Sequence, residues 1–273
     1  MGDTVGYGPF PNECVSAVRG FTSVLGNHDR AVRDLYPVLI GIPYGGPPAS
    51  KMPPSTDHFN PEAYGAALQN ARMLTPESFE YLKGLKSRPY VDTEEMFAAV
   101  HGSFHGIEKC DPFRGFDSIY VDTPTRALNA MESLIFSGTG KARYIKLGLV
   151  GHTHRHMVST AWVKTDFRMM AGEESYASFD LKFYKGSRKV KVKLGKATDI
   201  PGSWEPKVLF NSGSVGQPRN GTPDACYGVV ELGDNGEVEL ELRQVKYDIK
   251  ETQKKMTEKK FPESLIIVLS PRN

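Results

Sequence analysis

Histidines that follow short apolar segments are the main chemical feature of this sequence of 273 residues. Three such segments end in polar turns: Phe21–Leu25 before Gly26-Asn27-His28-Asp29, Met96–Val100 before His101, and Tyr144–Val150 before Gly151-His152-Thr153-His154. We expect each segment to be a buried strand, which places the polar groups at strand carboxyl ends, where the sites of α/β sheets lie. Asp3, close to the start of the sequence, adds a carboxylate to this set.

Carboxylate, amide and imidazole groups in combination are typical ligands of divalent metal ions. Scattered histidines are usually surface or core residues, but the shared strand-end position favours a metal site over coincidence. The cysteines, Cys14, Cys110 and Cys226, are far apart and form no C-x-x-C pair, which argues against a structural thiolate site. Imidazole and carboxylate ligands accept Mn, Fe, Zn or Ni, and the sequence does not choose among them.

Four motifs, in this order along the chain, closely resemble those of the calcineurin-like metallophosphoesterases. They are Gly2-Asp3, Gly26-Asn27-His28-Asp29, His101 and Gly151-His152-Thr153-His154. Three further stretches resemble a prokaryotic, phosphodiesterase-like branch of that family: Gly6-Tyr7-Gly8-Pro9, Pro11-Asn12-Glu13-Cys14 and Gly213-Ser214-Val215-Gly216-Gln217-Pro218-Arg219. The resemblance covers most of the chain and implies an α/β fold, a four-layer αββα sandwich. It also implies hydrolysis of a phosphodiester or phosphomonoester by attack of a metal-bound hydroxide.

The resemblance assigns a role to each motif residue. Asp3 is implied to bridge two divalent metal ions. The other implied ligands are Asn27, His101 and His152 for one metal, and His154 for the second. His28 is implied to be catalytic and to face the phosphoryl group, with Asp29 holding it in place.

In this family, a strand that ends in Asp-x-His supplies two ligands to the second metal. No such motif precedes Asp3 in this sequence. We expect the natural start to lie upstream of Met1, because the loss of a central strand leaves unpaired sheet edges. A truncated protein with only one complete metal shell is the alternative. His105 and His156 are candidate substitute ligands, although second-layer or surface positions explain them better. Two other functions stay open: a serine/threonine protein phosphatase, and a catalytically impaired metal-binding scaffold.

We expect one domain over residues 1–273, with a proline-rich loop at 37–58 and a β-rich insert at 157–206. Within that insert, a basic hairpin over Lys182–Lys196 is read as a solvated strand face rather than as a binding patch for polyanions. Helices are expected after Pro11, Pro61 and Pro76, over Pro124–Phe136, and in the tail from Asp248. A second hairpin pairs Ala225–Leu232 with Glu237–Val245.

Composition excludes several classes of protein. The 34 basic and 32 acidic residues nearly balance, so net charge gives no indication of nucleic-acid binding. The longest apolar runs, such as Leu265–Leu269, are far shorter than the roughly 18 residues of a membrane span. With no visible signal peptide and an odd number of cysteines, the expected location is the cytoplasm, and the expected partner is a phosphate-ester substrate.

Overall fold

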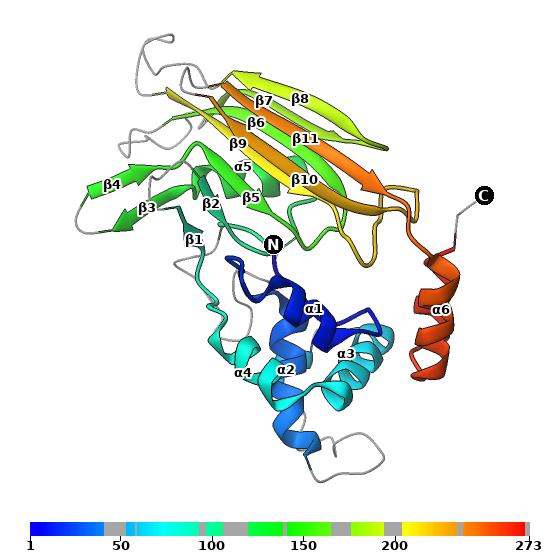
Figure 1. The fold of residues 1–273 in the computed structure, drawn as a ribbon. Coiled ribbons are helices and arrows are strands. Elements are labelled where there is room, and N and C mark those ends of the chain that lie inside the picture. Colours follow the sequence, from blue (N-terminus) through cyan, green and yellow to red (C-terminus); the bar gives the residue numbers. More distant parts are fainter. Residues whose placement is uncertain are drawn as a thin grey trace.

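Two large sheets, a two-stranded sheet and a group of helices make up the described part of the computed structural model (Figure 1). The structure describes residues 1–40, 53–57, 59–92, 97–105, 120–138, 141–164, 176–193, 204–233 and 237–270. The predicted mixed α/β fold is confirmed. No helix in these ranges is long and apolar enough to cross a membrane.

The six-stranded sheet brings the motif-bearing turns to one edge. Its strands, in spatial order, are β1 (Tyr90–Val91), β2 (Phe97–Ala99), β5 (Leu147–Val150), β9 (Trp204–Ser212), β6 (His156–Lys164) and β7 (Tyr176–Phe183). Strands β2, β5 and β9 are parallel neighbours, whereas β6 and β7 continue the sheet in antiparallel fashion. Because parallel strands end at the same edge, the turns that follow β2 and β5 lie side by side.

The second sheet lies against one face of the first and contains β10 (Ala225–Leu232), β11 (Glu237–Val245) and β8 (Arg188–Lys193). Val208 and Phe210 of β9 pack against Leu240 and Leu242 of β11 between the two sheets. Helix α5 (Pro124–Glu132) covers the opposite face of the six-stranded sheet through Ala127, Ala130 and Met131. Strands β3 (Ile135–Gly138) and β4 (Lys141–Tyr144) form a separate pair. The described elements thus give helix, sheet and sheet layers.

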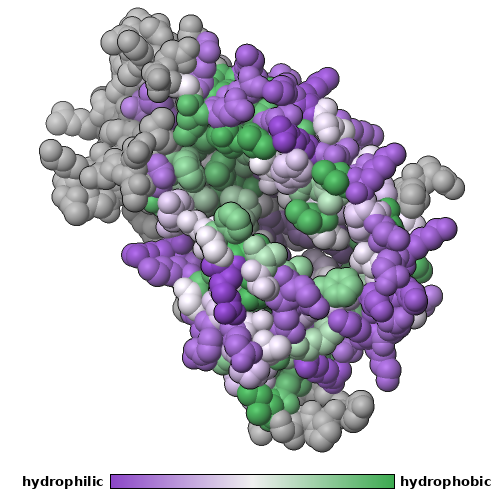
Figure 2. Space-filling model, viewed as in Figure 1, coloured by the Kyte–Doolittle hydropathy of each residue, from purple (hydrophilic) through white to green (hydrophobic). Residues whose placement is uncertain are grey.

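Among the described residues, the outer face of the second sheet carries charged side chains, and no helix packs on it. Lys189 and Lys191 of β8 form ion pairs with Glu239 of β11, at 3.0 and 3.1 Å. Hydrophilic side chains also gather over this region and over α6 (Ile249–Glu258) in the space-filling view (Figure 2). These pairs agree with the expectation of a solvated strand face.

A helical body lies below the edge of the six-stranded sheet (Figure 1). It contains α1 (Pro11–Val18), α2 (Asn27–Leu39), η2 (Pro54–Thr56), α3 (Pro61–Met73), α4 (Pro76–Gly84), α6 and α7 (Glu263–Ile267). The predicted helix starts are confirmed, since the side chains of Asn60 and Thr75 accept bonds from the first-turn amides of α3 and α4. Leu35 and Leu82 are among the fully buried residues that join α2 to α4.

Three sequence-based boundaries are wrong. Phe21–Leu25 is not a strand: Phe21 is 75% exposed, and the segment pairs with no strand among the described residues. The start of the proline-rich loop predicted over 37–58 is wrong, because α2 continues through Pro37 to Leu39, and residues 41–52 of that prediction lie outside the described residues. The helix predicted to reach Phe136 ends at Glu132, and β3 follows it. A short apolar run does not by itself make a strand, because a strand needs a neighbour to pair with its backbone hydrogen-bonding groups.

The β-rich region over 157–206 is not a separate insert. Strand β6 pairs with β9 along its whole length and is therefore part of the main sheet. The hairpin predicted over Lys182–Lys196 is also wrong, because β7 pairs with β6 while β8 pairs with β11 in the other sheet. The alternation of valine with lysine correctly predicted that this segment contains a strand, β8, but it could not predict that β8 pairs with β11. The predicted pairing of Ala225–Leu232 with Glu237–Val245 is confirmed. The turn predicted between them lies outside the described residues.

Candidate metal centre

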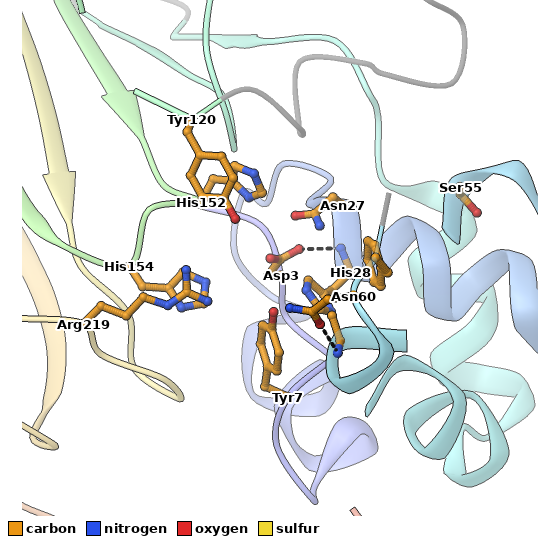
Figure 3. A pocket seen from close by; sticks show the side chains of 12 residues that line it. Asp3, Tyr7, Asn27, His28, Ser55, Asn60, Tyr120, His152, His154 and Arg219 are labelled. Carbon is orange, nitrogen blue, oxygen red and sulfur yellow. Dashed lines mark hydrogen bonds between the residues drawn. The ribbon is translucent and has the colours of Figure 1, made fainter. Parts of the chain in front are cut away.

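A pocket of about 150 Å³ opens where the edge of the six-stranded sheet meets the helical body (Figure 3). Predicted site residues line it from both sides: Asp3, Asn27 and His28 from the N-terminal turn and the start of α2, and His152 and His154 from the turn after β5. His101 lies directly behind them in contact with Asp3 and His152. The structure therefore brings the predicted motifs to one place.

Four of the predicted ligands form a tight cluster. The Nε2 atom of His101 lies 3.1 Å from Asp3 Oδ2, 3.2 Å from Asn27 Oδ1 and 3.2 Å from His152 Nδ1. The ligand atoms of Asp3, His101 and His152 all lie within 4.8 Å of one another. His154 lines the same pocket but stands outside this group.

The protonation state of His101 makes the cluster unusual. Its Nδ1 atom lies 2.7 Å from the carbonyl oxygen of Met1, which can only accept, so Nδ1 carries a proton. The Nε2 atom faces an Asp3 carboxylate oxygen, the Asn27 amide oxygen and a His152 nitrogen. Burial alone would lower the pKa of His101, but the Asp3 carboxylate raises it above its ordinary value, which favours a proton or another cation at this point. A backbone carbonyl behind a ligating imidazole is the usual way to fix its tautomer.

His154 is held in the same manner. Its Nδ1 atom lies 2.9 Å from the carbonyl oxygen of Gln217, so its proton is directed away from the pocket. The other ring nitrogen is left with a lone pair that can bind a metal. His105 and His156 do not line the pocket: His105 is exposed, and the buried His156 donates its backbone amide to Asn220.

Tight backbone packing positions the ligands. Asp3, His152 and His154 have φ angles of 52°, 60° and 59°, in the left-handed region that non-glycine residues rarely adopt. Gly26 permits the close approach of Asp3, because a Cβ atom at Gly26 would lie 2.0 Å from Asp3 Oδ1. That oxygen accepts the backbone N–H of His28 at 2.8 Å, which ties Asp3 to the first turn of α2.

Aromatic contacts, and not Asp29, hold the ring of His28. Its imidazole lies between Tyr7 and Phe59, with ring centroids 4.2 and 4.6 Å away. The carboxylate of Asp29 instead accepts the backbone amides of Val5 at 3.0 Å and Gly26 at 3.1 Å. Asp29 thus orders the backbone that carries Asp3, which corrects the expectation that it positions His28 directly.

Burial controls the charges in the pocket. It lowers the pKa of His28 to about 4, and, with the nearby His101, lowers the pKa of His152 to about 2. Burial and then Arg219 lower the pKa of His154 to about 3, so these three rings are neutral at pH 7. Burial alone would raise the pKa of Asp3, but the neighbouring imidazoles hold it below its ordinary value, which keeps the carboxylate ionised.

Sequence reasoning missed the other side of the pocket, which is lined by Tyr7, Tyr120 and Arg219 (Figure 3). Tyr7 and Arg219 stand in stretches that carry the family resemblance, which was the available signal, but no chemical role follows from their spacing. It also missed Asn70, a fully buried side chain of α3 that bonds the backbone of Gly6 and Gly8 and so fixes the turn that carries Tyr7.

Comparison with solved structures connects this geometry to a known family. A crystal structure of a metallophosphoesterase from Sphaerobacter thermophilus matches the chain with a TM-score of 0.62 and 27% sequence identity, covering 99% of this chain and 86% of that one. This match supports the resemblance of the chain to the calcineurin-like metallophosphoesterases. A metallophosphoesterase neighbour implies divalent metal ions, and Asp3, His101 and His152 form a group that could hold one.

Two further comparisons add less detail. An uncharacterised protein of Methanocaldococcus jannaschii is 27% identical over 267 residues, which is 97% of this chain and 82% of that protein. A hypothetical protein of Pyrococcus horikoshii shares the metallophosphoesterase-like fold of this chain, with a TM-score of 0.55 and 16% identity over 98% of this chain and 82% of that one. No family sequence model matches the chain.

Proposed function

We propose that the chain hydrolyses a phosphate ester, either a phosphodiester or a phosphomonoester, with the help of bound divalent metal. The observation that carries this proposal is the convergence of the Asp3, Asn27 and His152 side chains on Nε2 of His101. A buried, ionised carboxylate is costly without a proton or a metal cation beside it, so the cluster suits a cation. The match to a metallophosphoesterase of known structure supports phosphate-ester hydrolysis as the general reaction.

In this proposal Asp3, Asn27, His101 and His152 hold one metal ion, and Asp3 and His154 contribute to a second. Mn, Fe, Zn and Ni all fit a donor set of imidazole, carboxylate and amide. Metal ions in such sites polarise the phosphoryl group, activate water as a nucleophile and neutralise developing charge. A phosphodiester is our first choice of substrate, and a phosphoprotein is the second.

His28 acts on the phosphoryl group rather than on metal. It lines the pocket, and its ring stays neutral at pH 7 because burial lowers its pKa to about 4. A neutral imidazole can donate one hydrogen bond to a phosphoryl oxygen, which stabilises charge there without the cost of burying an ammonium-like cation. Tyr7 and Phe59 restrict the ring to one orientation for this task.

Paired substitutions test this division of roles. His28→Ala should lower turnover of bis(p-nitrophenyl) phosphate or p-nitrophenyl phosphate by about 10²–10⁴-fold while bound metal, measured by mass spectrometry, stays unchanged. His152→Ala should lose metal as well as turnover, and His105→Ala, an exposed histidine outside the pocket, should match the wild-type protein. Equal metal loss in the first two variants would show that His28 is a ligand. A metal-loaded protein that cleaves neither ester nor a phosphopeptide would leave only the metal-binding scaffold.

A further inference from the structure

Three hydrogen-bond donors with no role in the metal cluster line the same pocket. Tyr7 comes from the N-terminal turn, Tyr120 from the segment before α5, and Arg219 from the loop between β9 and β10. Figure 3 shows both phenol hydroxyls directed into the pocket and Arg219 extending beside His154. Three separate parts of the chain therefore contribute donors to one space, opposite the acceptor-rich ligand cluster.

Arg219 is held in place but is not neutralised. Its backbone N–H donates to the His154 carbonyl at 2.9 Å, and its guanidinium donates to Gln217 Oε1 at 2.8 Å. Within the described part of the chain, no carboxylate forms an ion pair with it. A guanidinium has five N–H donors, so most of them remain available to a ligand after the bond to Gln217 is made. A positioned cation with no acidic partner favours an anion in the pocket.

The two phenols complete a donor surface. The ring of Tyr7 packs against His28 and meets His154 edge-on, with ring centroids 4.2 and 5.9 Å away. The ring of Tyr120 stacks on His152, with centroids 4.0 Å apart and an interplanar angle of 28°, while 39% of the residue stays exposed. Both rings are thus fixed by contacts that leave their hydroxyls toward the pocket.

We propose that Arg219, Tyr7 and Tyr120 form a phosphoryl cradle that binds the non-bridging oxygens of the phosphate ester and of the orthophosphate product. This inference rests on the proposed function and adds to it the residues that recognise the substrate. Guanidinium geometry matches two phosphate oxygens at once, and phenols add neutral donors at the remaining directions. None of the three residues belongs to the ligand cluster, so their loss should weaken phosphate binding and leave metal in place.

Orthophosphate binding to the manganese-loaded protein, measured by calorimetry, tests the cradle without turnover. Arg219→Gln should weaken orthophosphate binding by about 10- to 100-fold, the usual size of a charged hydrogen bond, and Tyr7→Phe or Tyr120→Phe by about 2- to 10-fold. Arg219→Lys should recover only part of the loss, because it keeps the charge without the two-pronged geometry. Arg243→Gln, which removes an exposed arginine paired with Glu241 in the second sheet, is the matched control and should bind as wild type.

The outcomes separate this inference from the proposed function. Wild-type phosphate affinity in Arg219→Gln, or failure of the wild-type protein to bind orthophosphate, would overturn the cradle. Loss of metal in Arg219→Gln would also overturn it, because the residue would then act by holding His154. Weakened phosphate binding with metal retained supports the cradle even if no ester is cleaved, a result that would contradict only the proposed hydrolysis. With diester substrate, the cradle predicts a higher KM in the variants at unchanged metal content.

Discussion

Replacing Gly26 with alanine tests how closely the metal centre depends on backbone packing. An added Cβ atom would lie 2.0 Å from Asp3 Oδ1 and 2.2 Å from the Asp3 backbone nitrogen. Ordinary contacts begin near 3.4 Å, so the carboxylate oxygen would have to retreat by about 1.4 Å. Functional constellations tolerate displacements of only about 0.5 Å, so the shift should disrupt the cluster with His101. The obstructing atoms belong partly to backbone, and no change of rotamer can relieve the clash.

We therefore expect Gly26→Ala to lose most of its tightly bound metal and to be destabilised by about 1–3 kcal/mol, the usual cost of overpacking. Metal content after dialysis and the midpoint of urea unfolding measure the two effects. Gly8→Ala is the matched control, because a Cβ atom there meets nothing within 4 Å. A Gly26→Ala protein with wild-type metal content and stability would refute both the packing argument and the placement of Asp3 at the centre.

Two further predictions concern the metal-free protein. Its stability should rise with pH between about 4 and 6.5, because burial holds the pKa values of His28, His152 and His154 at about 4, 2 and 3, so the unfolded chain binds more protons. Asp29, whose pKa burial and the Asp3 charge raise to about 7, offsets part of this rise, because it binds a proton in the folded state. Urea unfolding of chelator-treated protein that is flat across this range would contradict the assignment. Asn70→Ala should cost about 2–4 kcal/mol in thermal unfolding, because it leaves the buried backbone groups that Asn70 now bonds without partners.

The ligand cluster could be predicted from the sequence because its members sit where chain geometry forces convergence. His101 follows β2 and His152 follows β5, and these strands are parallel neighbours in the sheet. Asn27 was expected after a strand that does not exist; it lies at the start of α2 and reaches the cluster from there. The motif was therefore a better guide to position than the element assigned to it.

Contacts between distant segments could not be predicted. The pairing of β8 with β11 joins residues 188–193 to 237–242, and alternating valines and lysines describe a strand without naming its neighbour. Tyr7 and Arg219 are 212 positions apart in the printed sequence, and only the folded chain shows that both line one pocket. Recognition residues on loops lack the periodic pattern that reveals core residues, since their position depends on the whole scaffold.

The left-handed backbone at Asp3, His152 and His154 has a consequence for attempts to improve this protein. Each such residue costs of order 1–3 kcal/mol relative to a relaxed conformation, and glycine adopts the same angles without strain. A random library screened only for resistance to heat, in the absence of metal, should therefore enrich glycine at these three positions. The most thermostable clones would then be the ones that had lost the centre, so selection of a useful variant needs metal present in the screen from the first round.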